Sequence, residues 1–447
     1  MKSAVVVGGG VVGIVSAILL KERYDSVYLI EKASELGGLY RSIHTENGNV
    51  FDQGYHTPGD TGIKELDKLI YGDLNPKDWN TYHYLKGGNF YKGYLNKTST
   101  GIDTKLLGDE LYEQGLKQLL NSPASKNHYD SADEQLRYEF GDIFTDEIFT
   151  PLAKKWTGCE LSELAQNAHR VFGMGLLCLD REKTNELKKG ESPAKFRIGH
   201  HHYEDKFSEL KFYYPKSGGA EQWLFHLLGK LEASGVTILT EQMVTSINHQ
   251  EKHISSVTLE SGQKVETDIL VWTVPLFLCI KAAELKPPFK GSPPERLNVA
   301  IFHFAFDKPI NIDNHYITCS EPSINIQQIT CYPNLANNRE DPKPRLSATI
   351  LSKSAVDFEL LKPIVLEELK TIGVIPADAN LIDYHTQTLP GAYPIPTHQF
   401  VEDSKLQYDF VTENLSNIIC TGKAVGTAFV SFSLVADAYK KISQIFN

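Results

Sequence analysis

The sequence predicts an α/β protein that combines a βαβ-based sheet domain, assembled from separate stretches of chain, with an antiparallel sheet domain and inserted helices. Three observations predict this class. Residues 1–31 follow the order strand, glycine-rich turn, helix, strand. Residues 61–205 carry charged and aromatic side chains at helical spacing, and residues 276–405 contain short runs that alternate between apolar and polar. A chain of 447 residues is long enough for two or three domains.

Composition and charge narrow the class further. Hydrophobic residues make up 41% and charged residues 23%, as in ordinary soluble proteins. The net charge of −11 argues against nucleic acid or an anionic membrane as the main partner. The six cysteines form no CxxC pair, which excludes a zinc ribbon and predicts free thiols in a reducing compartment. No run approaches the roughly 18 apolar residues of a membrane span, and the N-terminus passes directly into a strand, so we expect a cytoplasmic protein.

A glycine-rich turn follows the first apolar strand, Ala4–Val7. In "GGGVVG", Gly8, Gly10 and Gly13 satisfy the pattern GxGxxG. Gly8 permits a tight turn, Gly10 lets the backbone approach a pyrophosphate, and Gly13 lets the following helix pack closely on the strand. The pattern predicts a phosphate-binding turn at the N-terminus of that helix.

An acidic residue ends the second strand, Ser26–Glu31, which follows a helix expected over residues 11–22. Glu31 lies 31 − 13 = 18 residues after the last glycine, close to the spacing of about 20 for a ribose-binding acid. Strand, helix, second strand and acid together predict a Rossmann-like dinucleotide site. An acid at this position favours an unphosphorylated ribose.

The stretch "EKASELGGLYRS" identifies the dinucleotide more closely. Gly37 and Gly38 provide a second loop for close backbone approach, and Arg41 provides donors for phosphate oxygens. Here the sequence resembles the FAD-binding fold of the amine oxidase, protoporphyrinogen oxidase and phytoene desaturase superfamily, which includes the UDP-galactopyranose mutases. A surface salt bridge is the alternative role for Arg41.

Later segments of the same domain also resemble this superfamily. In "VFDQGYHTP", the resemblance implies that Gly54, Tyr55 and His56 pass near the flavin ring, while a structural role is the alternative for His56. "YPKSGG" opens a helix expected over residues 220–233, followed by the strand "VTILT". The resemblance implies that the strand around "VTSI" presents backbone groups to the adenine, at Val244. "TDILVWTVP" reads as a further strand of the same sheet, so this domain is discontinuous.

The segment "FTDEIFTPLAKKWTGCELSELAQNAHR" resembles a phrase of the mutases. The resemblance implies substrate roles for Lys155, Trp156 and Arg170. A core position is the alternative for Trp156, and a helix-terminal salt bridge is the alternative for Arg170. "LPGAYPIPT" is expected to break the antiparallel sheet with its prolines, and Tyr393 either lines the substrate pocket or belongs to a rigid turn.

The chain closes with a buried strand, Asn417–Cys420, then a loop and a helix from about Ser431. In the resembling superfamily this segment completes the flavin site, with the helix N-terminus facing the pyrimidine edge of the ring. The resemblance and the glycine motifs together predict FAD as cofactor, bound by Gly8, Gly10, Val12, Gly13, Glu31, Lys32, Gly37, Gly38, Leu39, Arg41, Gly54, Tyr55, His56, Val244, Gly422, Lys423, Ser431, Phe432 and Ser433.

The predicted domains follow from these segments. They are an FAD-binding domain of residues 1–60, 206–275 and 406–447, a helical insertion of residues 61–205 and a substrate-binding sheet domain of residues 276–405.

Absent motifs restrict the chemistry. There is no second GxGxxG for a nicotinamide domain, no cysteine in the closing loop for covalent FAD, and no metal-ligand cluster. "NVAIFHFAF" lacks the lysine that amine oxidases of the superfamily carry beside the flavin. We expect non-covalent FAD and a small-molecule substrate, with His56 and Tyr393 as catalytic candidates; the oligomeric state stays open.

Three functions remain. The first is an FAD-dependent oxidoreductase that takes a hydride from carbon. The second is a redox-neutral nucleotide-sugar mutase, suggested by "KKWTG" and "GKAVGT", although Ala428, Phe429 and Val430 replace the Tyr-Arg-Tyr run that helps bacterial mutases hold substrate. The third is a flavin-binding protein without turnover.

Overall fold

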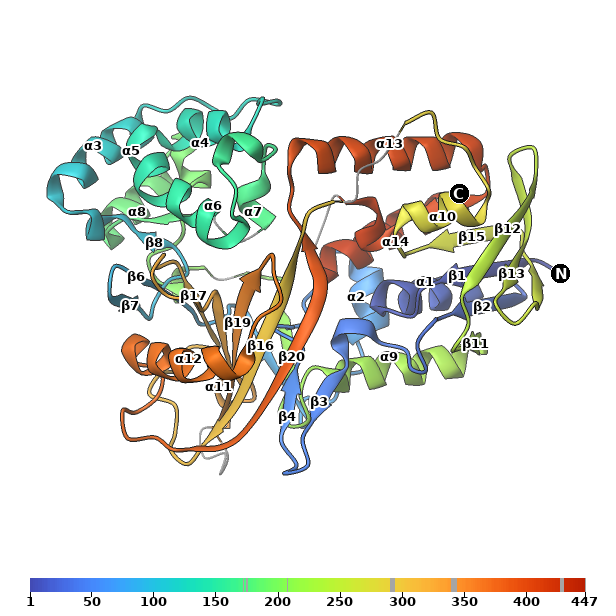
Figure 1. Ribbon diagram of the computed structural model, residues 1–447, viewed down its shortest axis with the longest axis horizontal. Coiled ribbons are helices and arrows are strands. Elements are labelled where there is room, and N and C mark those ends of the chain that lie inside the picture. The colour runs from blue at the N-terminus through green and yellow to red at the C-terminus, as the bar shows by residue number, and fades with distance from the viewer. Residues whose placement is uncertain are drawn as a thin grey trace.

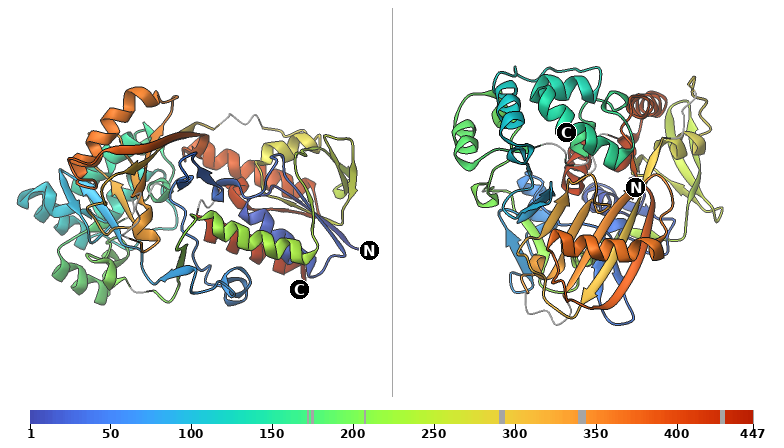
Figure 2. Two further views of the ribbon diagram at one scale, coloured as in Figure 1. Left: turned by 90° about the horizontal axis from the view of Figure 1, so that it is seen from below. Right: turned by 60° about the vertical axis from the view of Figure 1, so that its left-hand side comes forward.

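The computed structural model describes residues 1–171, 173, 176–206, 208–289, 294–338, 344–426 and 430–446. Two sheets organise these residues, one parallel and one mostly antiparallel, with a group of helices beside the second sheet (Figure 1). Both chain ends lie at the end of the molecule that the parallel sheet occupies, as the views of Figures 1 and 2 agree. The chain therefore leaves this sheet and returns to it.

The parallel sheet has five strands in the order β11-β2-β1-β15-β21. Its strands are β1 (Ser3–Val7), β2 (Ser26–Ile30), β11 (Thr237–Leu239), β15 (Ile269–Trp272) and β21 (Ile418–Cys420). Every neighbouring pair is parallel. The expected strands at residues 4–7 and 26–31 are found within one residue of their predicted ends.

Helices cover one face of the parallel sheet and a small antiparallel sheet covers the other. The helices are α1 (Val11–Lys21), α9 (Glu221–Ser234) and α14 (Ser431–Phe446), which share a core with β1 and β2. The other face packs against β12 (Val244–Gln250), β13 (His253–Leu259), β14 (Lys264–Glu266) and α10 (Leu276–Ala282). Because both faces are buried, the strands are apolar throughout, as the sequence shows.

The second sheet has seven strands in the order β20-β16-β19-β18-β17-β6-β7. They are β6 (Gly87–Tyr91), β7 (Tyr94–Asn96), β16 (Arg296–Phe306), β17 (Tyr316–Cys319), β18 (Gln328–Cys331), β19 (Arg345–Ser352) and β20 (Leu381–Pro394). Only the β6–β17 pair is parallel. Helix α12 (Phe358–Ile372) crosses one face, as the right panel of Figure 2 shows, and buries Phe302, Phe304 and Ile350 beneath it.

The region expected to be helical also contains strands. Besides β6 and β7, it forms β5 (Trp79–Tyr82), which pairs with β10 (Phe212–Pro215), and β8 (Ile102–Asp103), which pairs with β9 (Leu177–Cys178). A Cβ atom on Gly87 would lie 2.8 Å from the ring of Tyr316, and one on Gly88 would lie 2.6 Å from Ile317. The glycines thus allow β6 to approach β17 closely, which is a tertiary contact that local helical spacing does not reveal.

The expected break at "LPGAYPIPT" is wrong, because β20 continues to Pro394. Leu389 pairs with Val299 and Tyr393 pairs with Leu297, so three residues of β20 oppose the single residue Asn298 in a bulge. The edge position of β20 tolerates Pro390, which donates no ladder hydrogen bond.

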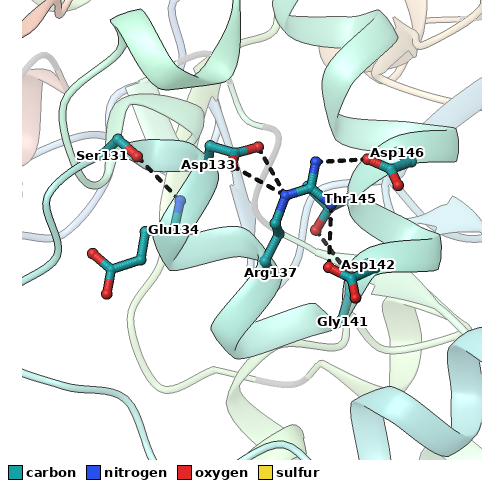
Figure 3. A network of polar contacts seen from close by, with 8 residues as sticks. All are labelled: Ser131, Asp133, Glu134, Arg137, Gly141, Asp142, Thr145 and Asp146. Carbon is teal, nitrogen blue, oxygen red and sulfur yellow. Dashed lines mark hydrogen bonds and ion pairs between the residues drawn. The ribbon is translucent and has the colours of Figure 1, made fainter.

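Helices α3 (Asp109–Leu120), α4 (Ala132–Phe140), α5 (Asp142–Phe144), α6 (Thr150–Thr157), α7 (Ala168–Val171) and α8 (Arg181–Lys189) lie beside the seven-stranded sheet (Figure 1). Arg137 joins several of them (Figure 3). Its guanidinium donates to Asp133 at 3.0 Å, Asp142 at 3.1 Å and Asp146 at 2.7 Å. The contacts link α4 and α5 to the π-helical turn Thr145–Phe149, which leads directly into α6.

The remaining elements are the hairpin β3 (Ser42–His44) and β4 (Val50–Asp52), α2 (Lys64–Tyr71), α11 (Tyr332–Leu335) and α13 (His398–Asn414). No helix in the described ranges is both long and apolar enough to cross a membrane. All six cysteines are buried and unpaired.

Candidate functional site

The two glycine loops lie against each other at the carboxyl end of the parallel sheet. Gly37 donates its backbone N–H to the carbonyl of Gly9 at 2.8 Å, and Gly10 and Gly37 form a parallel bridge. A Cβ atom on Gly38 would lie 3.7 Å from the Cα atom of Gly10. The loops are therefore placed so that a single ligand can contact both.

The glycines of the first loop are required for different reasons. Gly8 has φ +105°, and a Cβ atom there would lie 2.3 Å from Thr273 Oγ1. A Cβ atom on Gly13 would lie 1.8 Å from the carbonyl oxygen of Gly8. A Cβ atom on Gly10 would meet no protein atom within 4 Å. The open space at Gly10 fits a pyrophosphate that approaches the backbone closely.

The N-terminus of α1 suits an anion. Its N-cap residue, Gly10, provides no side-chain hydrogen bond, and its first turn contains no acidic residue. The first N–H groups of a helix have no partner within the helix, and the helix dipole favours negative charge there. The residues present therefore fit the diphosphate of a dinucleotide, with Val12 in this first turn.

Glu31 ties the second strand to the first glycine loop. One carboxylate oxygen accepts the N–H of Gly9 at 2.6 Å, and the other accepts the N–H of Ala33 at 2.8 Å. The carbonyl of Glu31 accepts the N–H of Gln242 at 3.0 Å, which brings the start of β12, and so Val244, to this edge. Lys32 is exposed and Leu39 is half-buried nearby in the chain.

Replacing Glu31 with alanine is expected to weaken FAD retention by about 10- to 100-fold, because charge-assisted hydrogen bonds contribute roughly 1.5–3 kcal/mol. The ratio of flavin absorbance to protein after repeated desalting measures this loss. The exposed Glu22 is the matched control, and its alanine variant should retain FAD as the parent does. Equal flavin content in the two variants would refute the role of Glu31.

Arg41 forms a salt bridge, which from the sequence was the alternative to a contact with phosphate. Its Nε atom donates to the carbonyl of Leu36 at 2.6 Å, and its guanidinium lies 3.2 Å from the carboxylate of Glu35. The side chain is three-quarters buried. The contacts fix Arg41 beside the second glycine loop, and its phosphate role stays a prediction.

The segment after β4 brings polar atoms to the same region. Tyr55 Oη, His56 Nδ1 and Thr57 Oγ1 are buried and have no hydrogen-bond partner within the described ranges. The preceding Gly54 has φ +97°, which turns the chain here. The ring of His56 lies 5.2 Å from that of Tyr40. Burial lowers the pKa of His56 to about 4, so its imidazole is neutral at neutral pH.

The closing segment returns to the glycine loops. A Cβ atom on Gly422 would lie 3.6 Å from both Thr273 O and Val12 Cγ1. The hydroxyl groups of Ser431 and Tyr40 are 2.8 Å apart, which connects the start of α14 to the second loop. Phe432 and Ser433 follow in this first turn, with Ser433 exposed. Ala428 and Phe429 lie outside the described residues.

The face of the seven-stranded sheet opposite α12 is polar, and sequence reasoning missed it. Strand pairing places on this polar face His303, Tyr316, Thr330, Ser347, Thr349 and Gln387. The segment after β4 lies on it: the ring of Tyr55 is 4.5 Å from that of Tyr316, and Gln387 donates to Gln53 at 2.8 Å. The sequence offers one indication of this polar face, which is the single histidine, His303, within the apolar run "NVAIFHFAF".

The carboxylate of Asp52 links this face to the parallel-sheet side. It accepts hydrogen bonds from Tyr214 Oη at 2.8 Å, Ala220 N at 2.8 Å and Ser42 Oγ at 3.1 Å. The backbone N–H of Asp52 donates to Tyr332 Oη at 3.1 Å. Through Ser347, the hydroxyl of Tyr332 is connected to His303 Nδ1, with 2.7 Å at each step.

Asp52 is expected to make stability depend on pH. Burial raises its pKa from the ordinary 3.8 to about 6, so between about pH 4 and 6 the folded protein binds more protons than the unfolded chain. The free energy of unfolding should therefore fall as pH rises through this interval, by about 3 kcal/mol for this group. Denaturant unfolding of the parent and of Asp52→Asn at pH 4, 5, 6 and 7 tests this. The difference between the two should change with pH, and parallel curves would contradict it.

The four substrate candidates occupy different surroundings. The ammonium group of Lys155 donates to the carbonyls of Cys319, Glu321 and Ile326 at 2.8, 2.7 and 3.1 Å. Trp156 is 2% exposed within a core cluster, which is its alternative role. Arg170 is exposed on α7. Tyr393 lies near the closing segment, with its ring centroid 5.9 Å from Lys423 Nζ.

The parallel sheet and the two glycine loops at its carboxyl end together define a fold that suits a dinucleotide. The chain belongs to the flavin containing amine oxidoreductase family, whose model matches residues 12–439. It is therefore a flavoenzyme oxidoreductase, and its cofactor is FAD.

Individual relatives agree with this membership. A 1-hydroxycarotenoid 3,4-desaturase from Flavobacterium sp. (strain P99-3) is 24% identical over 352 residues, which are 72% of this chain and 67% of the relative. A reduced UDP-galactopyranose mutase shares the fold at a TM-score of 0.76 with 15% identity, covering 100% of this chain and 96% of that one. A putrescine oxidase bound to putrescine matches at 0.62 with 16% identity, covering 100% and 99%.

Proposed function

We propose that this flavoenzyme takes a hydride from a carbon atom of a small organic substrate that binds between the FAD and the polar face of the seven-stranded sheet. The FAD-binding domain would be the discontinuous Rossmann-like unit built around the parallel sheet. The observation that carries the proposal is the polar face itself. Half-buried Gln387 and buried His303 lie on it as neighbours, and Gln387 also donates to Gln53 in the segment after β4 at 2.8 Å.

The chain's own residues would hold the cofactor and orient the substrate. Gly10, Gly38 and the N-terminus of α1 would hold the diphosphate, and Glu31 the ribose. FAD, once bound, supplies the oxidant that accepts the hydride. Cys420, the cysteine that precedes the closing loop, is 1% exposed, and burial raises its pKa to about 12. An inert, buried thiol supports non-covalent FAD.

His56 and Tyr393 are the candidates for contact with the substrate. His56 is neutral at neutral pH and has a buried, unpartnered Nδ1 atom, so it is available as a hydrogen-bond partner. Tyr393 lies at the end of β20, on the same side of the sheet as Gln387. Substrate between them would be in reach of both domains.

Anaerobic reduction of the bound FAD tests the function. The holoenzyme is mixed with amines, alcohols and saturated or polyenic hydrocarbons in turn, and bleaching of the visible flavin band is followed. Gln387→Leu should slow reduction by the active substrate without lowering FAD content. Thr388→Leu, a change on the opposite face of the same strand, is the control and should not.

Two results would contradict the proposal. If no carbon donor bleaches the band, and a nucleotide sugar is isomerised only after chemical reduction of the flavin, the protein is a redox-neutral mutase. If Gln387→Leu and Thr388→Leu reduce at the same rate as the parent, the polar face does not hold the substrate.

A further inference from the structure

The closing segment carries a lysine, Lys423, whose ammonium group lies over an aromatic ring and has no carboxylate partner in the described ranges. The side chain of Lys423 is exposed, and within the described ranges no hydrogen bond or ion pair involves its ammonium group. Desolvation nevertheless lowers its pKa, and no carboxylate of the described residues opposes this effect. In the described part of the chain, no carboxylate therefore neutralises the charge of this ammonium group.

The ammonium group of Lys423 lies between the first glycine loop and the end of β20. The preceding Gly422 packs near Val12 and Thr273, beside the first glycine loop. The ammonium group itself lies 5.9 Å from the centre of the Tyr393 ring, at the end of β20. Lys423 therefore extends from the cofactor side towards the second sheet, where the proposed function places the substrate.

The neighbours of Lys423 also favour an anion. Burial lowers the pKa of His56, and the charge of Lys423 adds to this lowering, so the two side chains are close enough to interact. The buried Nδ1 atom of His56 has no partner among the described residues. The neutral imidazole of His56 could donate a hydrogen bond to a carboxylate that binds Lys423. It would bring no negative charge of its own to repel that carboxylate. A substrate ammonium group would meet like charge, and no carboxylate among the described residues would balance it.

We propose that Lys423 binds an anionic group of the substrate, a carboxylate or another oxyanion, so that the enzyme selects oxyanion-bearing substrates over free amines. The inference rests on the proposed function and names the substrate class for that same site. It also gives a physical reason for selectivity that differs from the amine chemistry named in the family's description.

Titration of the oxidised holoenzyme with benzoate, benzamide and benzylamine tests the inference without turnover. Binding is read from perturbation of the flavin absorption band. Benzoate should bind more tightly than the neutral amide or the cationic amine. In Lys423→Met, benzoate affinity should fall by about 10- to 100-fold, because a charge-assisted hydrogen bond is lost, while benzamide affinity should not change. Lys423→Arg should retain benzoate.

Lys440→Met is the matched control, because Lys440 is an exposed lysine of α14. It should bind benzoate as the parent does. Tighter binding of benzylamine than of benzoate to the parent would overturn the inference, even if Lys423→Met fails to fold. So would a Lys423→Met protein that keeps its benzoate affinity, or one that folds but no longer holds FAD. These outcomes leave substrate-dependent flavin reduction by the parent intact, whereas failure of the proposed function removes that reduction.

Discussion

Replacing Gly13 with alanine should lower the free energy of unfolding by about 2 kcal/mol or more. The new Cβ atom would lie 1.8 Å from the carbonyl oxygen of Gly8, which belongs to backbone and has no rotamer that could relieve the clash. Overpacking of well-packed cores costs roughly 1–3 kcal/mol, and an overlap with backbone belongs at the upper end. The better helix propensity of alanine offsets only about 1 kcal/mol. Denaturant unfolding of the apoprotein measures the loss.

Gly10→Ala is the matched variant in the same turn. Gly10 has φ −71° and ψ 174°, a conformation that alanine adopts freely, and its Cβ atom would contact no protein atom within 4 Å. The apoprotein should therefore keep its stability within about 0.5 kcal/mol. FAD affinity should fall by at least about tenfold, or ~1.4 kcal/mol, because the added methyl group occupies the space of the diphosphate.

The pair separates the needs of the fold from those of the ligand. An apoprotein of Gly13→Ala as stable as the parent would show that helix α1 does not pack as the structure has it. Full FAD affinity in Gly10→Ala would show that the open space at this glycine serves no ligand.

Lys155→Met is expected to cost about 3 kcal/mol of stability. Three backbone carbonyls of the β17–β18 connection accept hydrogen bonds from the ammonium group, and methionine offers none. Each buried acceptor left without a donor costs roughly 1–3 kcal/mol, and removal of a desolvated charge offsets part of the sum. Burial lowers the pKa of Lys155 to about 8, so the group is still mostly protonated at neutral pH.

Lys154→Met provides the control for this variant. Lys154 is the preceding residue, more than half exposed, and pairs only with Glu160 on the surface at 2.8 Å. Its replacement should change stability by at most about 1 kcal/mol. Thermal unfolding of both variants gives the comparison. If Lys155→Met unfolds like the parent but loses affinity for substrate, the substrate role expected from the mutase-like phrase is right and the structural role is wrong.

The parallel sheet was predictable because its signals are local. GxGxxG places the first strand and helix, and Glu31 marks the end of the second strand. Short apolar runs such as "VTILT" and "DILVW" indicate strands that are buried on both faces. Their side chains report burial directly, so the strand bounds agree with the structure within a few residues.

The seven-stranded sheet was harder to predict because its geometry depends on contacts between distant segments. Strand β6 lies in residues 61–205, where the spacing predicts helices, and it pairs with β17, more than 200 residues later. From the sequence, Pro390 predicts that the strand ends there. Only the pairing of β20 shows that it is an edge strand with a bulge, where proline is tolerated. The polar face is read from strand pairing, which places Gln387 and His303 on one side although neither belongs to a motif.

Membership of the family was predictable from the glycine motifs, whereas roles of single residues were not. In the phrase that resembles the mutases, the ammonium group of Lys155 donates hydrogen bonds to backbone carbonyls. The next residue, Trp156, is buried in a hydrophobic core cluster. Whether such a side chain contacts substrate or stabilises the fold depends on its burial, and sequence resemblance alone does not show burial.

The order of strands in the parallel sheet has a consequence for synthesis in the cell. Strand β15 has β1 on one side and β21 on the other, and β21 begins at residue 418 whereas β1 ends at residue 7. During translation, the open edge of β1 must wait for β15, more than 250 residues later, and the other edge of β15 must then wait for β21. Such long-range pairing is slow and leaves strand edges exposed to aggregation. The nascent chain is therefore expected to depend on chaperones, and FAD to bind only after the closing segment with Gly422 and Ser431 has been synthesised.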